Sequence, residues 1–290
     1  MAVEATIQAG RGARPAYAAG QPSQLRVIRV IWQREVLTHT RDRARMISGL
    51  FMPLVMMLML GEGLGRSIGQ LGGGIDYRQF IFPGMVAQAV LMNSVFTGAS
   101  IIWDKQFGFL REILVAPISR TSIAVGKLLG GTTIALLQGS VIFIFAPLLG
   151  VDLSLLVVLK MLAIMALLSL TMTSVGIAMA SRLPTQESFQ MVTQLTIMPT
   201  MFLSGVMFPI NNIPTWLEVI AKLNPVTYAV APLRATALGN VVQEGTPSAF
   251  SVTNVELFGH TLSTAESLAI VFAFGVFILL FAVQSFRRAE

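Results

Sequence analysis

The sequence of 290 residues contains no cysteine and only two histidines, and charged residues make up 12% of it. Without cysteine, the chain has no disulfide bonds and no thiolate chemistry. His39 and His260 stand far apart, and neither lies in a spacing typical of a metal site. Soluble domains carry about 25% charged residues, roughly twice the fraction found here. These absences exclude a disulfide-stabilised scaffold and an ordinary soluble domain.

The scarcity of charge leaves six runs without any Asp, Glu, Lys or Arg, each of 16 to 30 residues. The runs cover residues 46–61, 79–103, 128–151, 161–181, 188–217 and 267–286. A helix needs about 20 mostly apolar residues to cross a ~30 Å hydrocarbon core. Five runs reach that length, and the first falls a little short. The pattern is typical of a membrane protein.

We therefore predict an all-α integral membrane protein with six transmembrane helices in one transmembrane domain, residues 23–290. The spans are expected at about 46–62, 80–103, 122–148, 154–181, 188–208 and 266–286. Residues 1–22, rich in Ala, Gly, Arg and Pro, are expected to form a disordered cytoplasmic tail.

Residues 23–42 predict an N-terminal amphipathic helix that lies in the membrane interface. Val27, Ile31 and Val36 share its apolar face, Arg29 lies on the opposite face, and Glu35 interrupts the apolar one. A solvated helix packed on another subunit is the alternative.

The stretch from about 210 to 236 is apolar but interrupted by prolines. Pro214 is expected to begin a short helix, and Asn224-Pro225 to end it. A second short helix is expected from about Val226 to Leu238. Because neither piece is long enough to span a bilayer, we predict a re-entrant helical hairpin packed against protein.

The distribution of basic residues predicts the orientation of the chain. Fifteen of the 20 Lys and Arg residues lie in segments on the same side of the membrane as the N-terminus. Cytoplasmic loops carry such an excess. Six spans then place both termini in the cytoplasm and the hairpin on the extracytoplasmic side.

The predicted spans contain few side chains that could couple transport to ions or catalyse a reaction. No Asp or Glu lies within the six runs, and Lys160, near one end of the fourth span, is expected to snorkel to the interface. Ion-coupled carriers keep ionisable groups near mid-membrane, so coupling to an ion gradient is disfavoured. Gly126-Lys127 lacks the first Gly and the Ser/Thr of a P-loop, and no nucleophile–base set stands out.

From these absences we expect no catalytic residues, no metal site and no cofactor in this chain, and a separate chain as the motor for any uphill transport. The net charge of +6 lies beside membrane segments, which disfavours a nucleic-acid partner. The expected surroundings are a lipid bilayer.

Two stretches of the sequence are distinctive enough to compare with known protein families. Residues 107–120 read Phe-Gly-Phe-Leu-Arg-Glu-Ile-Leu-Val-Ala-Pro-Ile-Ser-Arg, followed by Gly126-Lys127. Residues 202–210 read Phe-Leu-Ser-Gly-Val-Met-Phe-Pro-Ile, and lead to Leu-Asn-Pro-Val-Thr-Tyr at 223–228 and to Arg234. These strings and their spacing resemble permeases of type-2 ATP-binding-cassette (ABC) exporters. The resemblance covers the chain from about residue 24 and looks closest to daunorubicin-resistance-type drug exporters and the related nodulation-factor exporters.

The resemblance implies a permease of the prokaryotic cytoplasmic membrane that pairs with a second permease copy, as a homodimer or a heterodimer. It implies two cytosolic ATPase subunits, which carry ATP and Mg. The dimer seam would form from the first and fifth spans, and the hairpin would close the path outside. Its implied gate residues are Phe208, Asn224, Pro225 and Tyr228.

The resemblance also implies a coupling helix at about 106–116, which contacts the ATPase together with the N-terminal amphipathic helix. The residues that carry this contact would be Phe107, Phe109, Leu110, Arg111, Glu112, Ile113 and Leu114, with Arg34 and Glu35 of the N-terminal helix.

Polar residues within spans are candidates for the translocation path. Gln190, Gln194 and Met198 recur at intervals of four residues and so share one face of the fifth span. Phe202 continues that face, and Asn93 is a candidate from the second span. Alternatively, such residues form hydrogen bonds between neighbouring helices.

The expected function is the membrane subunit of an ATP-driven exporter for hydrophobic or amphipathic molecules, such as drugs or lipids. Export of a polysaccharide or lipid-linked glycan stays open. A non-transporting membrane anchor for a cytosolic ATPase stays open as well.

Overall fold

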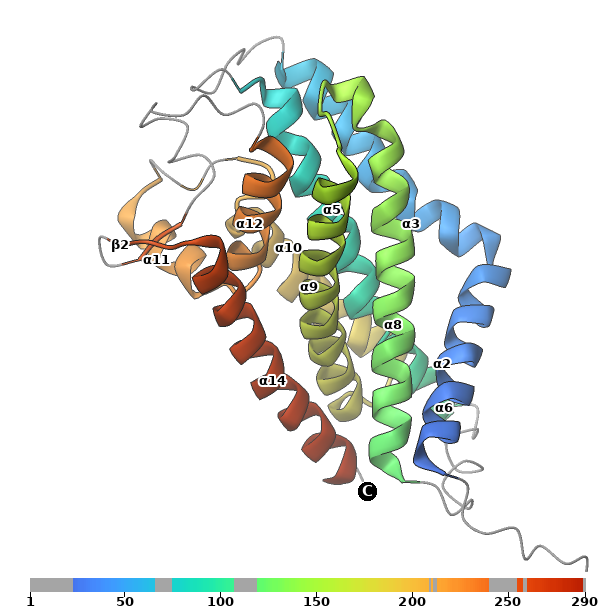
Figure 1. Cartoon of the computed structure of the whole chain (residues 1–290). Helices are drawn as coiled ribbons and strands as arrows, with labels where there is room; N and C mark the ends of the chain where they lie inside the picture. Colours follow the sequence, from blue (N-terminus) through green and yellow to red (C-terminus); the bar gives the residue numbers. More distant parts are fainter. Residues whose placement is uncertain are drawn as a thin grey trace, which may run out of the picture.

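The structure is a computed structural model that describes residues 23–65, 75–106, 119–208, 210, 213–239, 255–257 and 260–288. The expected cytoplasmic tail at 1–22 and nearly all of the expected coupling helix at 106–116 lie outside these ranges. The described chain is helical apart from one pair of two-residue strands, which confirms the expected all-helical membrane fold (Figure 1).

The N-terminal part of the described chain forms two consecutive helices. Helix α2 spans Gln24–Arg41, and helix α3 spans Arg43–Leu58 and continues into a π-helical turn at Met59–Leu64. Asp42 separates α2 from α3 because its side chain accepts a hydrogen bond from the backbone N–H of Arg45 at 3.0 Å. Such a cap satisfies one of the donors left open at a helix start.

The second expected span is two helices, α5 at Tyr77–Phe96 and α6 at Ala99–Gln106. Asp76 begins α5 with a capping box, in which its carboxylate accepts from the backbone and the Gln79 side chain accepts from the backbone of Asp76. Two residues, Thr97 and Gly98, join α5 to α6.

Helices α8, α9 and α10 follow, at Arg120–Ile142, Leu155–Arg182 and Gln186–Leu203. Each helix is preceded by a residue whose hydroxyl accepts a hydrogen bond from the backbone N–H three residues later. These capping residues are Ser119 for α8, Ser154 for α9 and Thr185 for α10. Two 3₁₀ turns, Phe143–Phe145 and Pro147–Leu149, and Gly150 in the left-handed region (φ 71°) separate α8 from α9.

In the C-terminal third, the described residues form two short helices and one long one. Helix α11 spans Thr215–Leu223 and α12 spans Thr227–Leu238, within a residue of the helices expected from the prolines. Strands β1 (Glu256–Leu257) and β2 (His260–Thr261) pair antiparallel. Helix α14 spans Thr264–Arg288.

Five helical segments of the described chain are long and apolar enough to cross a membrane: Arg43–Leu64, Tyr77–Asp104, Arg120–Phe145, Leu155–Arg182 and Thr264–Gln284. The expected span at 188–208 is not among them. Its helix, α10, ends at Leu203 after 18 residues, and the chain turns at Gly205 with φ at 77°. The three glutamines of the helix also lower its apolar character.

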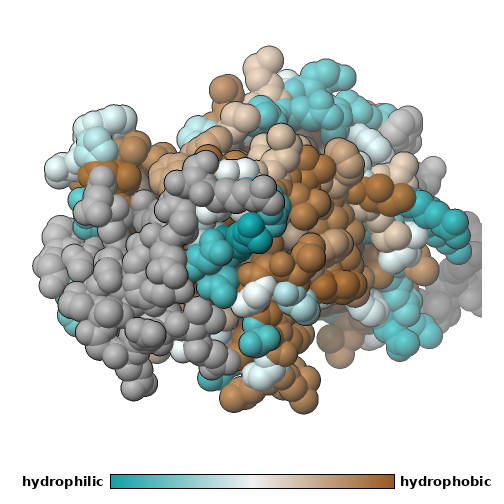
Figure 2. All heavy atoms as spheres, turned by 90° about the horizontal axis from the view of Figure 1, so that it is seen from above, coloured by the Kyte–Doolittle hydropathy of each residue, from teal (hydrophilic) through white to brown (hydrophobic). Residues whose placement is uncertain are grey.

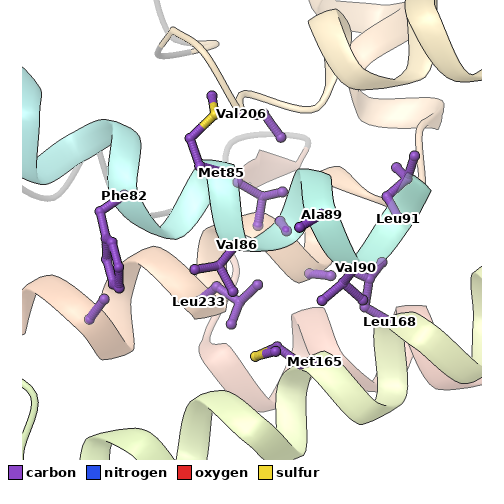
Figure 3. Packing of buried hydrophobic residues seen from close by; sticks show 14 of the residues in the cluster. Phe82, Met85, Val86, Ala89, Val90, Leu91, Met165, Leu168, Val206 and Leu233 are labelled. Atoms are coloured by element: carbon purple, nitrogen blue, oxygen red, sulfur yellow. The ribbon is translucent and has the colours of Figure 1, made fainter. Parts of the chain in front are cut away.

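Helix α5 forms the centre of the bundle. Its span is 78% buried, against 17% for the α3 span and 22% for α14. Figure 3 shows Val86 and Val90 of α5 packed against Met165 and Leu168 of α9, with Leu233 of α12 beside them. Figure 1 shows the same helices side by side at the core, with α14 and α2 at its flanks.

Glycine permits close backbone contact between helices in this core. A Cβ on Gly176 of α9 would lie 2.3 Å from the carbonyl oxygen of Val95, and one on Gly98 would lie 2.3 Å from the carbonyl oxygen of Gly176. Small residues allow helix backbones to meet in this way within membranes. The break between α5 and α6 is therefore in backbone contact with α9.

Apolar side chains also make up much of the surface. From above, Figure 2 shows broad hydrophobic areas and separate hydrophilic patches over the described residues. Phe51 of α3, Leu195 of α10 and Phe277 of α14 are each at least 64% exposed. Contiguous exposed apolar surface marks contact with lipid or with another protein.

Candidate functional site

Helix α2 lies directly on α8, as seen at the lower right of Figure 1. The contact depends on two glycines of α8, one turn apart. A Cβ on Gly126 would come within 2.8 Å of the Ile31 side chain, and one on Gly130 within 2.7 Å of Glu35 Cβ. The Trp32 indole also donates a 3.0 Å hydrogen bond to Thr133. The N-terminal helix is thus packed on its own chain.

Four charged side chains form a buried ion cluster at this contact: Arg34 and Glu35 of α2, Asp104 of α6 and Lys127 of α8. The Lys127 ammonium lies 2.8 Å from Glu35 Oε1 and 2.7 Å from Asp104 Oδ2, and it donates a 2.8 Å hydrogen bond to Ser100. Arg34 Nη2 lies 3.1 Å from Glu35 Oε1 and 3.0 Å from Asp104 Oδ2. The ion cluster therefore joins three helices.

Because these charges are buried, the cations and the carboxylates of the ion cluster depend on each other. The Lys127 side chain is 1% exposed and that of Glu35 is 10% exposed. Burial alone would raise the pKa of Glu35, but the charges and hydrogen bonds of Lys127 and Arg34 outweigh it and hold that pKa below its ordinary value. The carboxylates of Glu35 and Asp104 need these cations, because an unpaired buried charge is costly.

A cavity of about 930 Å³ lies beside the ion cluster. Its walls come from α2, α3, α5, α6, α8 and α10. Three members of the ion cluster line the cavity: Arg34, Glu35 and Asp104. Apolar side chains line it too: Met52, Pro53, Met92, Phe96 and Trp103. The cavity thus offers both polar and apolar side chains to a ligand, and its volume lies in the size range of small-molecule sites.

Residues 26–238, more than half of the chain, match the family described as ABC-2 type transporter. The chain belongs to the ABC-2 type transporter family. It is therefore a multi-pass membrane permease that lacks an ATPase domain, and permeases of this family pair with an ATP-binding subunit.

The permease has curated relatives of similar length. It is 29% identical over 251 residues to the "Putative transport permease ycf38" of Cyanophora paradoxa, with 84% of this chain and 83% of the relative covered. It is 27% identical over 215 residues to "Nodulation protein J" of Rhizobium leguminosarum bv. viciae, with 73% and 82% covered. It is 28% identical over 213 residues to "Nodulation protein J" of Rhizobium meliloti (strain 1021), with 72% and 80% covered.

The residues expected to contact the ATPase divide into two groups. Those from Phe107 to Leu114 lie outside the described ranges, so their role stays a prediction. Of the two on α2, Arg34 is half-buried and Glu35 is buried, and both face the ion cluster of the permease itself. Their described partners are therefore Lys127 and Asp104.

The structure brings together part of the expected translocation path. Asn93 of α5 and Gln190 of α10 both line the cavity. Gln194, Met198 and Phe202 lie outside it on the exposed face of α10, where Met198 is 50% exposed and Phe202 is 41% exposed. In a single protomer, Gln190 is the one of these four α10 residues that reaches the cavity.

The expected gate residues fix the joint between α11 and α12. The Asn224 amide donates to the carbonyl of Thr200 at 2.6 Å, and its Oδ1 accepts from the N–H of Val226 at 3.0 Å. Tyr228 donates a 2.6 Å hydrogen bond to the carbonyl of Lys222. Pro225 and Phe208 are half-buried. The hairpin is thus tied to the end of α10, and its role as a gate stays a prediction.

A buried arginine holds the other side of this hairpin. Arg234 of α12 is 4% exposed and donates a 2.6 Å hydrogen bond to the carbonyl of Gly205. Its guanidinium carbon lies 3.7 Å from the centre of the Phe80 ring, within the range of a cation–π interaction. Arg234 therefore connects α12 to α5 and to the turn after α10.

Sequence reasoning missed Lys127 and Asp104 as partners of Glu35. One signal was present, because Glu35 interrupts an otherwise apolar helix face, and the buried stripe of α2 is Val27, Ile31, Glu35 and His39. A second signal was the pair Gly126 and Gly130, whose four-residue spacing permits close helix contact. Neither signal identifies the partner helix on its own.

Proposed function

We propose that this permease is the membrane subunit of an ATP-driven exporter that moves hydrophobic or amphipathic molecules, such as drugs or lipids, out of the cell. The observation that carries the proposal is the cavity, whose wall combines apolar side chains with polar ones. An amphipathic molecule can place its chain against Met92 and Phe96 while its head meets Asn93 and Gln190.

The ion cluster supports a link between the cavity and a motor. Asp104 lies just before residues 107–118, and Lys127 follows shortly after them. In the proposed mechanism this segment holds the coupling helix, on which a separate ATPase pushes as it binds ATP and Mg. A displacement of Asp104 or Lys127 would pull on Glu35 and so on α2, which forms one cavity wall.

We further propose the complete assembly as two permease copies with two ATPase subunits, in a prokaryotic cytoplasmic membrane with both termini cytoplasmic. Exposed apolar residues on α3 and α10, such as Phe51 and Leu195, support a seam between copies. In this arrangement α10 is a short sixth span, about 27 Å long at 1.5 Å per residue, covered by the partner copy.

Vesicles that contain the permease and its ATP-binding subunit would test this function. We expect amphipathic dyes or drugs to stimulate ATP hydrolysis and to accumulate in inside-out vesicles only when ATP is present. A membrane anchor for the ATPase would show neither effect. ATP hydrolysis that no amphipathic compound alters, together with no accumulation, would overturn the proposal.

A further inference from the structure

Three glutamines line the cavity without a hydrogen bond to any described residue: Gln88 of α5, and Gln186 and Gln190 of α10. Gln88 is 2% exposed, and its Oε1 and that of Gln186 are buried without a donor in the described part of the chain. Buried amides are normally paired, and an unpaired one costs free energy. The amide oxygens of Gln88 and Gln186 therefore lack a partner that a ligand could supply, whereas the Gln190 side chain is exposed.

The charges around the same cavity cancel. Arg34 and Arg45 line it together with Glu35, Asp42 and Asp104. The Lys127 ammonium, bonded to two of these carboxylates, makes three cations and three anions. A charged ligand head would leave water without gaining a net opposite charge, which is unfavourable.

Asn93 adds a fourth amide to the cavity. Its Nδ2 donates to the carbonyl of Ala89 within the same helix at 2.8 Å, and its Oδ1 stands opposite Gly49 of α3. The polar part of the cavity is thus rich in neutral groups that both donate and accept hydrogen bonds.

From these observations we propose that the cavity selects amphiphiles whose head is uncharged and both donates and accepts hydrogen bonds, as hydroxyl and amide groups do. This rests on the proposed export function and makes Gln88 a specificity-determining residue. The apolar chain of the ligand packs against Met92, Phe96 and Trp103. A hydroxyl-rich head pairs with both ends of the glutamine amides, whereas a quaternary ammonium donates nothing and a polyether only accepts.

Gln88 needs only a small motion to reach the ligand. Its Oε1 is enclosed, so the amide turns about its terminal torsion to present the oxygen to the cavity. Torsions between an sp³ and an sp² carbon have broad minima, and this rotation is therefore easy. The amide oxygen then gains a donor from the ligand.

Four amphiphiles with the same dodecyl chain separate head chemistry from hydrophobicity. They are dodecyl maltoside, a methyl-capped dodecyl polyether, dodecyltrimethylammonium and dodecyl phosphate, each used below its micelle concentration. The permease–ATPase complex in lipid nanodiscs is titrated with each compound, and the concentration for half-maximal stimulation of ATP hydrolysis is measured. We expect the maltoside to act at the lowest concentration.

The variant Gln88→Leu keeps the size of the side chain and removes its hydrogen bonds. We expect the half-maximal concentration of the maltoside to rise about tenfold, as for the loss of one or two hydrogen bonds. The value for the capped polyether stays unchanged, and so does the maltoside value for Gln284→Leu, an exposed glutamine on α14.

Equal or tighter action of the ammonium or phosphate compound would overturn the proposed selectivity, as would an unchanged head preference in Gln88→Leu. Failure of the export function itself looks different, because none of the four compounds would then stimulate hydrolysis.

Discussion

Two buried cations, Lys127 and Arg234, hold the two ends of the helix bundle in different ways. Lys127 lies between two carboxylates on two other helices, Glu35 and Asp104. Arg234 has no carboxylate partner in the described part of the chain, and instead meets the carbonyl of Gly205 and the ring of Phe80. One site is an ionic junction, and the other is a neutral pocket around a single charge.

This difference separates two mechanical roles. The ion cluster connects three helices by charges that remain attractive when the helices move by an ångström, because Coulomb energy falls only as the inverse of distance. A cation–π contact and one hydrogen bond depend more closely on position. We therefore expect the Lys127 end to transmit motion and the Arg234 end to hold the hairpin still.

The largest expected effect is that of Lys127→Met. This change leaves Glu35 and Asp104 close together, and within the described part of the chain their remaining cationic partner is Arg34. Removing one partner from a buried ionic group costs about 3–5 kcal/mol. We expect the free energy of unfolding in detergent to fall by this amount, and export to be lost.

A variant that lacks Lys127 together with both carboxylates tests whether the loss of stability comes from unpaired buried charge. The triple variant Lys127→Met, Glu35→Gln, Asp104→Asn should recover most of the stability but not the export. Lys160→Met, at an exposed lysine of α9, should leave the free energy of unfolding unchanged. A single Lys127 variant as stable as the wild type would contradict the ionic junction.

A smaller effect is expected for Arg234→Met. The change removes the hydrogen bond to Gly205 and the contact with Phe80, but it leaves behind a carbonyl and a ring, not a charge. We expect a loss of about 2 kcal/mol in the free energy of unfolding. Arg78→Met, at a half-buried arginine paired with Glu62, should cost less than about 1 kcal/mol. An effect of Arg234→Met larger than that of Lys127→Met would reverse the comparison.

The contact of α2 with α8 can be weakened without touching a charge. In Gly130→Ala the new Cβ would meet Glu35 Cβ at 2.7 Å. Overpacking costs about 1–3 kcal/mol, and the better helix propensity of alanine offsets about 1 kcal/mol. We expect a net loss of about 1 kcal/mol in the free energy of unfolding. Gly63→Ala, where no atom lies within 4 Å of the added Cβ, should cost nothing through packing, and equal losses in the two variants would refute this explanation.

The smallest expected effect is on pH dependence. The pKa of Glu35 is lower in the folded permease than its ordinary value, so its contribution to stability is complete above about pH 4.3. The contribution is lost as the pH falls through the folded pKa. Unfolding experiments at several pH values should therefore show wild type and Glu35→Gln converging in acid. A difference that stays constant down to pH 2 would show that Glu35 acts without its charge.

The elements were largely predictable because their signals are local. Pro214 and Asn224-Pro225 bracket α11 in the sequence, and the structure begins and ends the helix there. The charge-free runs locate the long helices in the same way. The length of α10 was not predictable from the missing charges, because the chain turns at Gly205, within a run that continues to Leu217.

The candidate site was less predictable because it depends on contacts between distant residues. Lys127 and Glu35 are 92 positions apart, and only the packing of α2 on α8 brings them together. Spacing along one helix suggested a path from Gln190 to Phe202, yet the cavity wall follows neighbouring helices and leaves that face after Gln190. A periodic pattern shows which residues share a face, but not what covers it.

The account's central claim is that amphipathic molecules pass through the cavity beside the ion cluster. Inside-out vesicles with the permease, its ATPase and a fluorescent amphiphile test it directly when the cavity is filled by Met92→Trp. We predict ATP-dependent accumulation in wild type and in Met59→Trp, a change at an exposed residue outside the cavity, and none in Met92→Trp. Undiminished accumulation in a folded, ATPase-bound Met92→Trp variant would contradict the claim.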